Sequence, residues 1–142
     1  VPMCRIDPLA LAEGRIGVAD AVAFAQSCTA ISLIYSSADP DEVAATQAAL
    51  GRDQAGALVE HFLADVARSL RDLGYTRFLV AGGETAGAVV AGLGVQSLRI
   101  GPEIDPGVPW TRSIGGPPLL LALKSGNFGA DDFFTKAWSM LT

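Results

Sequence analysis

The sequence predicts an α/β fold, in which a mostly parallel sheet carries helices on both faces and forms a single three-layer domain. Short apolar segments with strand character alternate along the chain with longer segments of helical pattern, and this alternation is typical of parallel sheets. Residues 118–124 are apolar almost from end to end, as expected for a strand buried on both faces. A chain of 142 residues, 50% of them hydrophobic, can bury roughly two-thirds of its unfolded surface. We therefore expect one domain with one core.

The first part of the chain is predicted to hold two short helices and a strand. Residues 7–13 and 18–27 are rich in Ala and Leu and are separated by Gly14 and Gly17. Residues 29–35 are short, β-branched and apolar, and turn-forming residues follow them. This pattern favours a buried strand.

A strong helix-start signal comes next. Asp39 can cap a helix, Pro40 suits its first position, and Glu42 completes an arrangement like a capping box. This helix is expected to end before Gly51, and a longer helix is expected to run as far as a stop at Gly74. One face of the longer helix is apolar at helical spacing, with Val59, Phe62, Leu63, Val66, Leu70 and Leu73.

The second half is predicted to continue the alternation, with a strand over 77–81, a helix over 84–93 and a strand over 95–100. Residues 101–110 contain three prolines and are expected to be irregular. The loop they open, 101–118, is long enough to suggest a function.

The end of the chain is predicted to form a buried strand and a last helix. The strand is the apolar run 118–124, and Asp131 is the expected cap of a helix that runs to residue 141. The inner side of this helix is expected to carry Phe133, Phe134, Ala137, Trp138 and Leu141.

Two of the predicted strands run into glycine-rich turns that open helices. The turns are Gly82-Gly83-Glu84-Thr85 and Ser125-Gly126-Asn127. Because strand-to-helix turns of a parallel sheet lie at its carboxyl edge, we expect both turns, and the loop after Ile100, on one rim. Glycines let the backbone approach phosphate oxygens, and the N–H groups and dipole of a helix start attract them. The hydroxyls of Thr85 and Ser125 add donors, so the rim is a candidate phosphate site.

A simpler interpretation stays open, because glycine pairs at strand ends often only turn the chain. Neither turn is a Walker A loop, since the Lys-Ser/Thr ending is missing. The Gly-Gly-Glu-Thr-Ala-Gly segment also departs from the dinucleotide fingerprint, although Glu103 stands about 20 residues further on.

Other ionisable residues are weaker candidates. His61 is predicted to lie on the surface of the long helix, and we do not assign it a catalytic role. The acidic pair 131–132 either binds a metal or stabilises a helix start, and Glu103 and Asp105 either orient a ligand or cap turns. Lys124 either pairs with a phosphate or emerges into solvent. The metal ligands therefore stay unknown.

Charge and composition exclude several classes of protein. The net charge is −5 and the basic residues are scattered singly, so we expect no nucleic-acid binding. No apolar run reaches the about 18 residues of a membrane span, and no signal peptide is recognised. Cys4 and Cys28 lie far apart and are expected to be free thiols in a reducing compartment. We therefore expect a cytoplasmic protein. Because Val1 stands close to a strand, we also expect a piece of a longer polypeptide.

Three motifs follow one another in the second half of the chain. They are residues 80–89 with Gly-Gly-Glu-Thr, residues 98–110 with Gly-Pro-Glu-Ile-Asp-Pro-Gly-Val-Pro-Trp, and residues 121–129 with Lys-Ser-Gly-Asn-Phe-Gly. In this order and spacing they resemble the C-terminal nucleotide-binding domain of the four-carbon acid sugar kinases, and the resemblance spans residues 1–142.

The resemblance implies that ATP, with Mg²⁺, phosphorylates a hydroxyl of a four-carbon sugar acid such as a threonate, erythronate or 3-oxo-tetronate. It implies nucleotide contacts from the two turns, with Glu84 holding Mg²⁺ through water or contacting a nucleotide hydroxyl. The sugar acid and the catalytic base would belong to an N-terminal domain that this sequence lacks. We therefore name no catalytic residue, and we expect this chain to bind ATP or ADP without turnover and to self-associate. The expected nucleotide-binding residues are Gly82, Gly83, Glu84, Thr85, Ser125, Gly126 and Asn127.

Two rival interpretations remain. The same rim could belong to a non-catalytic module that binds a nucleotide or sugar phosphate, or that completes an interface. It could also belong to a fragment of a dinucleotide-binding oxidoreductase, which would prefer NAD to ATP.

Overall fold

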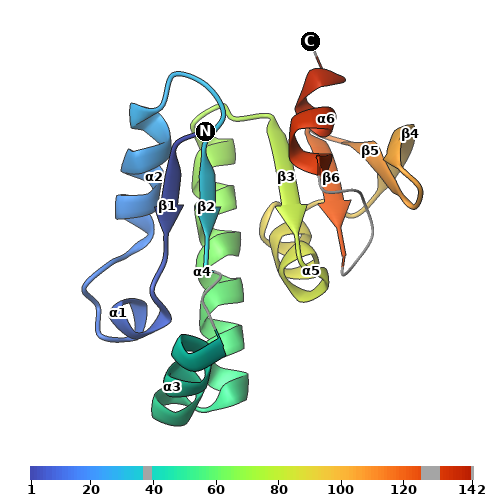
Figure 1. Ribbon diagram of the computed structural model, residues 1–142. Helices are drawn as coiled ribbons and strands as arrows, with labels where there is room; N and C mark the ends of the chain where they lie inside the picture. Colours follow the sequence, from blue (N-terminus) through green and yellow to red (C-terminus); the bar gives the residue numbers. More distant parts are fainter. Residues whose placement is uncertain (37–39, 126–131, 142) are drawn as a thin grey trace. The chain divides into compact units, whose positions relative to one another are not determined.

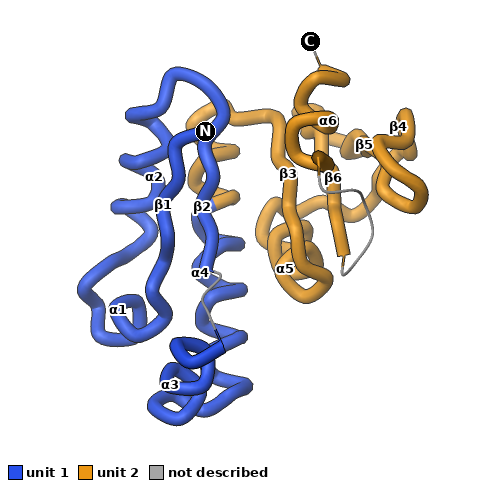
Figure 2. Tube along the Cα trace, viewed as in Figure 1, with its two compact units in different colours: residues 1–66 blue, residues 67–142 orange. Residues whose placement is uncertain are grey.

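The computed structural model describes residues 1–36, 40–125 and 132–141 and has an α/β fold (Figure 1). The chain divides into two compact units, residues 1–66 and residues 67–142, which are described separately (Figure 2). The predicted α/β class is confirmed. A single three-layer arrangement of the whole chain stays a prediction.

The first unit pairs two short parallel strands, with Met3 opposite Leu33. The predicted helices are confirmed, and the predicted strand over 29–35 is shorter than expected. Asp7 caps the first helix by accepting a hydrogen bond from the Leu9 N–H at 3.1 Å. Asp39, the predicted cap of the third helix, lies outside the described residues. The elements are β1 (Met3–Arg5), α1 (Pro8–Ala12), α2 (Val18–Ser27), β2 (Leu33–Tyr35), α3 (Pro40–Leu50) and the start of α4 (Arg52–Asp72).

Helix α4 has the predicted apolar stripe, in which Phe62, Val66 and Leu70 are buried. The predicted stop is also confirmed, because Gly74 adopts a φ of +99° that favours glycine. Leu73 lies beyond the end of the helix and is 53% exposed, so its predicted place in the stripe is wrong.

The second unit contains a four-stranded sheet in the order β3-β6-β5-β4. Strands β3 and β6 are parallel, whereas β5 is antiparallel to both of its neighbours. The prediction of a mostly parallel sheet is therefore not confirmed, and this sheet is mixed. Its strands are β3 (Arg77–Ala81), β4 (Leu98–Asp105), β5 (Val108–Ser113) and β6 (Leu120–Lys124).

The expected irregular segment 101–110 is instead part of a β-hairpin, so that prediction is wrong. Each proline occupies a position that a hairpin tolerates. Pro102 lies between two paired positions where the register of β4 shifts, Pro106 lies between the strands, and Pro109 precedes the first residue paired with β6. Gly107 completes the turn with a φ of +82°.

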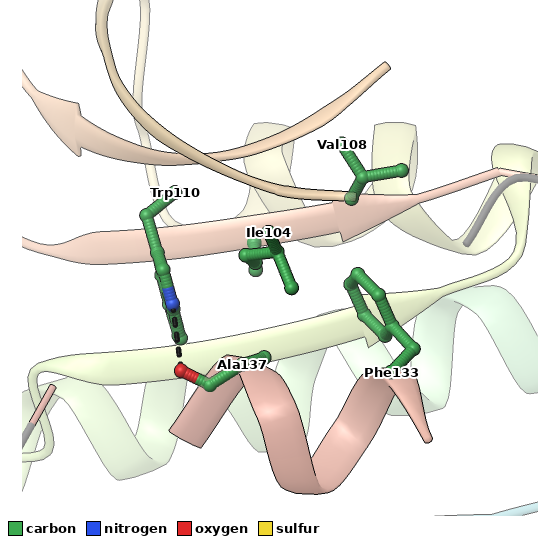
Figure 3. Close-up of a cluster of buried hydrophobic side chains, with 6 residues drawn as sticks. Ile104, Val108, Trp110, Phe133 and Ala137 are labelled. Carbon is green, nitrogen blue, oxygen red and sulfur yellow. Dashed lines mark hydrogen bonds between the residues drawn. The ribbon is translucent and has the colours of Figure 1, made fainter. Parts of the chain in front are cut away.

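Helices cover both faces of this sheet. Helix α6 (Phe133–Ser139) packs on one face, and α5 (Gly83–Gly92) packs on the other together with Ala67 of α4. In β6, Leu121 and Ala122 are 0% exposed although they point to opposite faces, so the predicted buried strand is confirmed. The α6 face buries Ile104, Val108, Trp110, Ala122, Phe133 and Ala137 (Figure 3).

One hydrogen bond fixes α6 on its face of the sheet. The Trp110 indole N–H donates to the Ala137 carbonyl at 2.9 Å in a buried position (Figure 3). Trp110 also lies against Trp138, with 5.6 Å between ring centroids. The predicted inner side of this helix is correct except for Phe134, which is 44% exposed. Phe134 directly follows the buried Phe133 and therefore lies on another side of the helix.

Candidate functional site

The turn between β3 and α5 is fixed by hydrogen bonds of the Gly82 N–H and carbonyl groups. Gly82 has a φ of +106°, which side chains other than glycine rarely adopt. Its N–H donates to the Lys124 carbonyl at 2.7 Å, and its carbonyl accepts the Ala86 N–H at 2.8 Å. The end of β6 and the first turn of α5 are therefore joined through one glycine.

The second predicted turn begins beside the first one. Strands β3 and β6 stay in register as far as Ala81 opposite Lys124. A Cβ placed on Gly83 would lie 3.6 Å from the Ser125 Cβ. The prediction that the two turns share an edge is confirmed for Ser125, which is exposed. Gly126 and Asn127 lie outside the described residues.

The start of α5 offers open hydrogen-bond donors. Among the described residues, no backbone acceptor is found for the N–H groups of Gly83, Glu84 and Thr85, as expected for the first turn of a helix. The Thr85 Oγ1 lies 3.4 Å from the position that a Cβ on Gly82 would take, so the hydroxyl stands over the turn. Donors of this kind, together with the helix dipole, suit an anion.

The β4–β5 hairpin reaches the same edge of the sheet. Because β5 is antiparallel to β6, with Trp110 opposite Ala122, residues that precede Trp110 lie toward the carboxyl end of β6. The segment after Ile100 therefore lies at the predicted edge, although it forms a hairpin and not the expected irregular loop. A carboxylate oxygen of Glu103 accepts the Gly107 N–H at 3.2 Å, which closes the turn.

Asp105 has a structural partner that sequence reasoning missed. Its carboxylate is buried and forms an ion pair with Lys136 of α6. The hydrogen bond that the Lys136 ammonium group donates to Asp105 raises the pKa of Lys136 above its ordinary value of 10.5. No local sequence signal could reveal this pair, because the two residues are 31 positions apart.

The other ionisable candidates are His61 and the acidic pair 131–132. His61 is exposed on α4, as predicted. Asp132 is at the N-cap position of α6, where its side chain caps nothing within the described residues, and Asp131 lies outside them. Across the described ranges, no group of three or more His, Cys, Asp or Glu side chains could hold a metal ion. Cys4 and Cys28 are free, as expected.

Comparison with known proteins places the chain in a family. A sequence profile described as "Nucleotide-binding C-terminal domain" matches residues 1–134. The chain belongs to this family. As a nucleotide-binding C-terminal domain, it is 59% identical over 140 residues to a 3-oxo-tetronate kinase of Pseudomonas fluorescens, with 99% of this chain and 33% of that protein covered. It is 61% identical over 137 residues to a 3-oxo-tetronate kinase of Burkholderia multivorans, with 96% and 32% covered.

A solved structure has the same fold as this nucleotide-binding domain. A Haemophilus influenzae protein of the DUF1537 family superimposes with a TM-score of 0.92 at 34% identity, covering 99% of this chain and 35% of that protein. The domain thus spans about a third of the length of the curated relatives it matches. Among the helices that the structure describes, none is both long enough and apolar enough to cross a bilayer.

Proposed function

We propose that this domain binds ATP for a kinase that phosphorylates a hydroxyl of a four-carbon sugar acid of the 3-oxo-tetronate type. The observation that carries the proposal is the meeting of Gly83 and Ser125 at one edge of the sheet. The chain that forms this edge belongs to a nucleotide-binding family, and relatives of the chain are named 3-oxo-tetronate kinase. A function in carbohydrate metabolism, in the cytoplasm, forms part of the proposal.

The described residues fit a polyphosphate chain. The N–H groups of Gly83, Glu84 and Thr85 point out of the first turn of α5 and suit phosphate oxygens. The absence of a side chain at Gly83 keeps open the space between this turn and Ser125. We assign hydroxyl donors to Thr85 and Ser125. We also assign nucleotide contacts to Gly126 and Asn127, which follow Ser125 in the sequence.

Glu84 is the exposed acidic residue in the first turn of α5. We assign to it a contact with Mg²⁺ through water, or with a hydroxyl of the nucleotide. When bound, Mg²⁺ neutralises phosphate charge and orients the transferred phosphoryl group. Phosphoryl transfer depends chiefly on such positioning and on electrostatic stabilisation.

The sugar acid and the catalytic base are assigned to the two-thirds of the relatives' length that this domain does not match. The nucleotide domain then holds the γ-phosphoryl group toward a hydroxyl presented by that other part. No residue of this chain is named as catalytic. The chain alone is expected to bind ATP or ADP without turnover.

Isothermal titration calorimetry of the chain tests the proposal. We expect binding of ATP in the presence of Mg²⁺, and no comparable binding of NAD. Stronger binding of NAD would favour the oxidoreductase interpretation, and the lack of any nucleotide binding would favour an interface module. A protein that carries this domain at its full length should transfer phosphate from ATP to 3-oxo-tetronate.

A further inference from the structure

Three arginines form a row across the four-stranded sheet. Arg77 of β3 and Arg112 of β5 both lie opposite Leu120 of β6, on its two sides. Arg99 of β4 lies opposite Arg112. Residues opposite one another in a sheet share a face. The three side chains are therefore neighbours, with about 10 Å between the strands of Arg77 and Arg112 and about 5 Å between those of Arg112 and Arg99. This set is the arginine row.

The arginine row lies at the end of the sheet opposite the nucleotide edge. Arg77 begins β3, whereas Ala81 and Gly82 mark its other end. All three arginines are exposed. Within the described residues, no ion pair is found for any of them. Like charges directly opposite in a sheet are destabilising, so an anionic partner would relieve a repulsion that the domain carries by itself.

Apolar side chains flank the row. Arg77 lines a shallow depression with Leu73 and Tyr75, and Arg99 and Arg112 line another with Ile114. Leu73 is 53% exposed and Ile114 is 56% exposed. Arginine is enriched at protein interfaces, and the cores of interfaces are apolar. The surface thus fits a polypeptide partner that carries both acidic and apolar side chains, and it is too wide for one small anion.

The acidic complement is present in the same chain. Residues 1–66 contain nine acidic and three basic side chains, a net charge of −6, whereas residues 67–142 contain six acidic and seven basic ones. Helix α3 buries none of its residues, and its Val43 is 40% exposed. Asp41 in its first turn and Asp53 in the first turn of α4 are both exposed. Exposed carboxylates therefore lie at both ends of α3, and the exposed Val43 adds an apolar group near its start.

We propose that the arginine row binds the acidic α3 region of a second copy of this chain. Each copy carries one arginine row and one α3 region, so a two-fold dimer would contain this contact twice. The planar guanidinium groups suit bidentate pairing with the carboxylates of Asp41 and Asp53, and Leu73 and Ile114 supply apolar contact. This interface does not depend on nucleotide binding.

Sedimentation velocity and a charge-exchange experiment test this interface. The wild-type chain should form a dimer that dissociates as salt screens the charges, for example between about 50 and 500 mM NaCl. One variant reverses the row with Arg77→Glu, Arg99→Glu and Arg112→Glu, and a second carries Asp41→Lys and Asp53→Lys. Each should weaken self-association by about tenfold or more. An equimolar mixture of the two should associate again, because both contacts in the mixed dimer then join opposite charges.

Arg15→Glu is the matched control, because it changes the charge of an exposed arginine that lies outside the row. It should leave the dimer intact, and circular dichroism should show that every variant is folded. A wild-type chain that stays monomeric at low salt would overturn the proposal, as would variants that fail to associate when mixed. If the chain is monomeric and an oligonucleotide binds it through the three arginines, the row is a nucleic-acid surface instead.

Discussion

Replacing Gly83 by Ala separates the proposed phosphate contact from the stability of the fold. Gly83 begins α5 without a positive φ, so alanine fits its backbone. Among the described residues outside its own helix, the added methyl group comes nearest to the Ser125 Cβ, at 3.6 Å, which is an ordinary van der Waals distance. The methyl group thus enters the space beside Ser125 without pushing on that side chain. We expect the variant to fold and to lose affinity for ATP.

This geometry sets the expected change in the free energy of unfolding and the expected loss of ATP affinity. Alanine is preferred to glycine in helices by about 0.5–1 kcal/mol, so the free energy of unfolding should stay equal or rise slightly. A phosphate oxygen that can no longer reach the Gly83 N–H loses a charged hydrogen bond worth about 1.5–3 kcal/mol. The dissociation constant for ATP should therefore rise about ten- to a hundredfold.

Gly87→Ala is the matched control in the same helix. Among the residues that the structure describes, a Cβ at Gly87 meets no atom within 4 Å outside its own helix, and the residue lies one turn beyond the N-terminus of α5. Calorimetry with Mg-ATP should give the wild-type affinity for Gly87→Ala, while thermal unfolding should show a similar or larger gain in stability. If Gly83→Ala binds ATP as tightly as Gly87→Ala, the assignment of phosphate to this turn is refuted.

Three further predictions concern the second unit. A Cβ on Gly101 would lie 2.8 Å from the Trp110 carbonyl oxygen, so Gly101→Ala should force β4 and β5 apart and lower the free energy of urea unfolding by about 1–3 kcal/mol; a loss below about 0.5 kcal/mol contradicts this. Trp110→Phe removes the buried donor to the Ala137 carbonyl and should cost about 1–3 kcal/mol in the same assay, and an unchanged denaturation midpoint would oppose the assigned role. Lys136→Met leaves the buried Asp105 carboxylate without this ion pair and should lower stability at pH 7. Because the pKa of Lys136 is raised above 10.5, the difference from wild type should persist below that pH and shrink as the pH rises through the raised pKa, so a difference independent of pH would contradict the assignment.

Part of the candidate site could be predicted from the sequence. A local pattern of glycines and a general rule for parallel strands were enough for that part. Each glycine turn is visible in the sequence, and parallel neighbouring strands bring their carboxyl ends to one edge. Strands β3 and β6 are such a pair, so Gly83 and Ser125 meet as expected. The rule says nothing of antiparallel strands. It therefore does not predict the hairpin closed by Glu103 and Gly107, which the sequence places at the edge only as an irregular loop because of its prolines.

The prolines of the hairpin show why local propensity misled the prediction. Pro102 and Pro109 each lack an N–H, which argues against a strand in isolation. In the folded sheet, Pro102 lies where the register of the edge strand shifts, and the pairing of β5 with β6 starts one residue after Pro109. Pro109 is paired with Glu103 of β4, where the register of the hairpin shifts, so both prolines lie in the irregular part of the β4–β5 ladder. Only the order of the strands decides which N–H groups are needed.

The sequence by itself determined the helices, the buried strand β6 and the glycine turns, because these depend on periodicity, capping and backbone preferences over a few residues. The tertiary structure alone decided the mixed sheet, the ion pair of Asp105 with Lys136, and the alignment of Arg77, Arg99 and Arg112. Arginines that are scattered singly along the chain become neighbours in space. The physical reason is that strand register joins residues far apart in sequence, and no local pattern encodes which strands will pair.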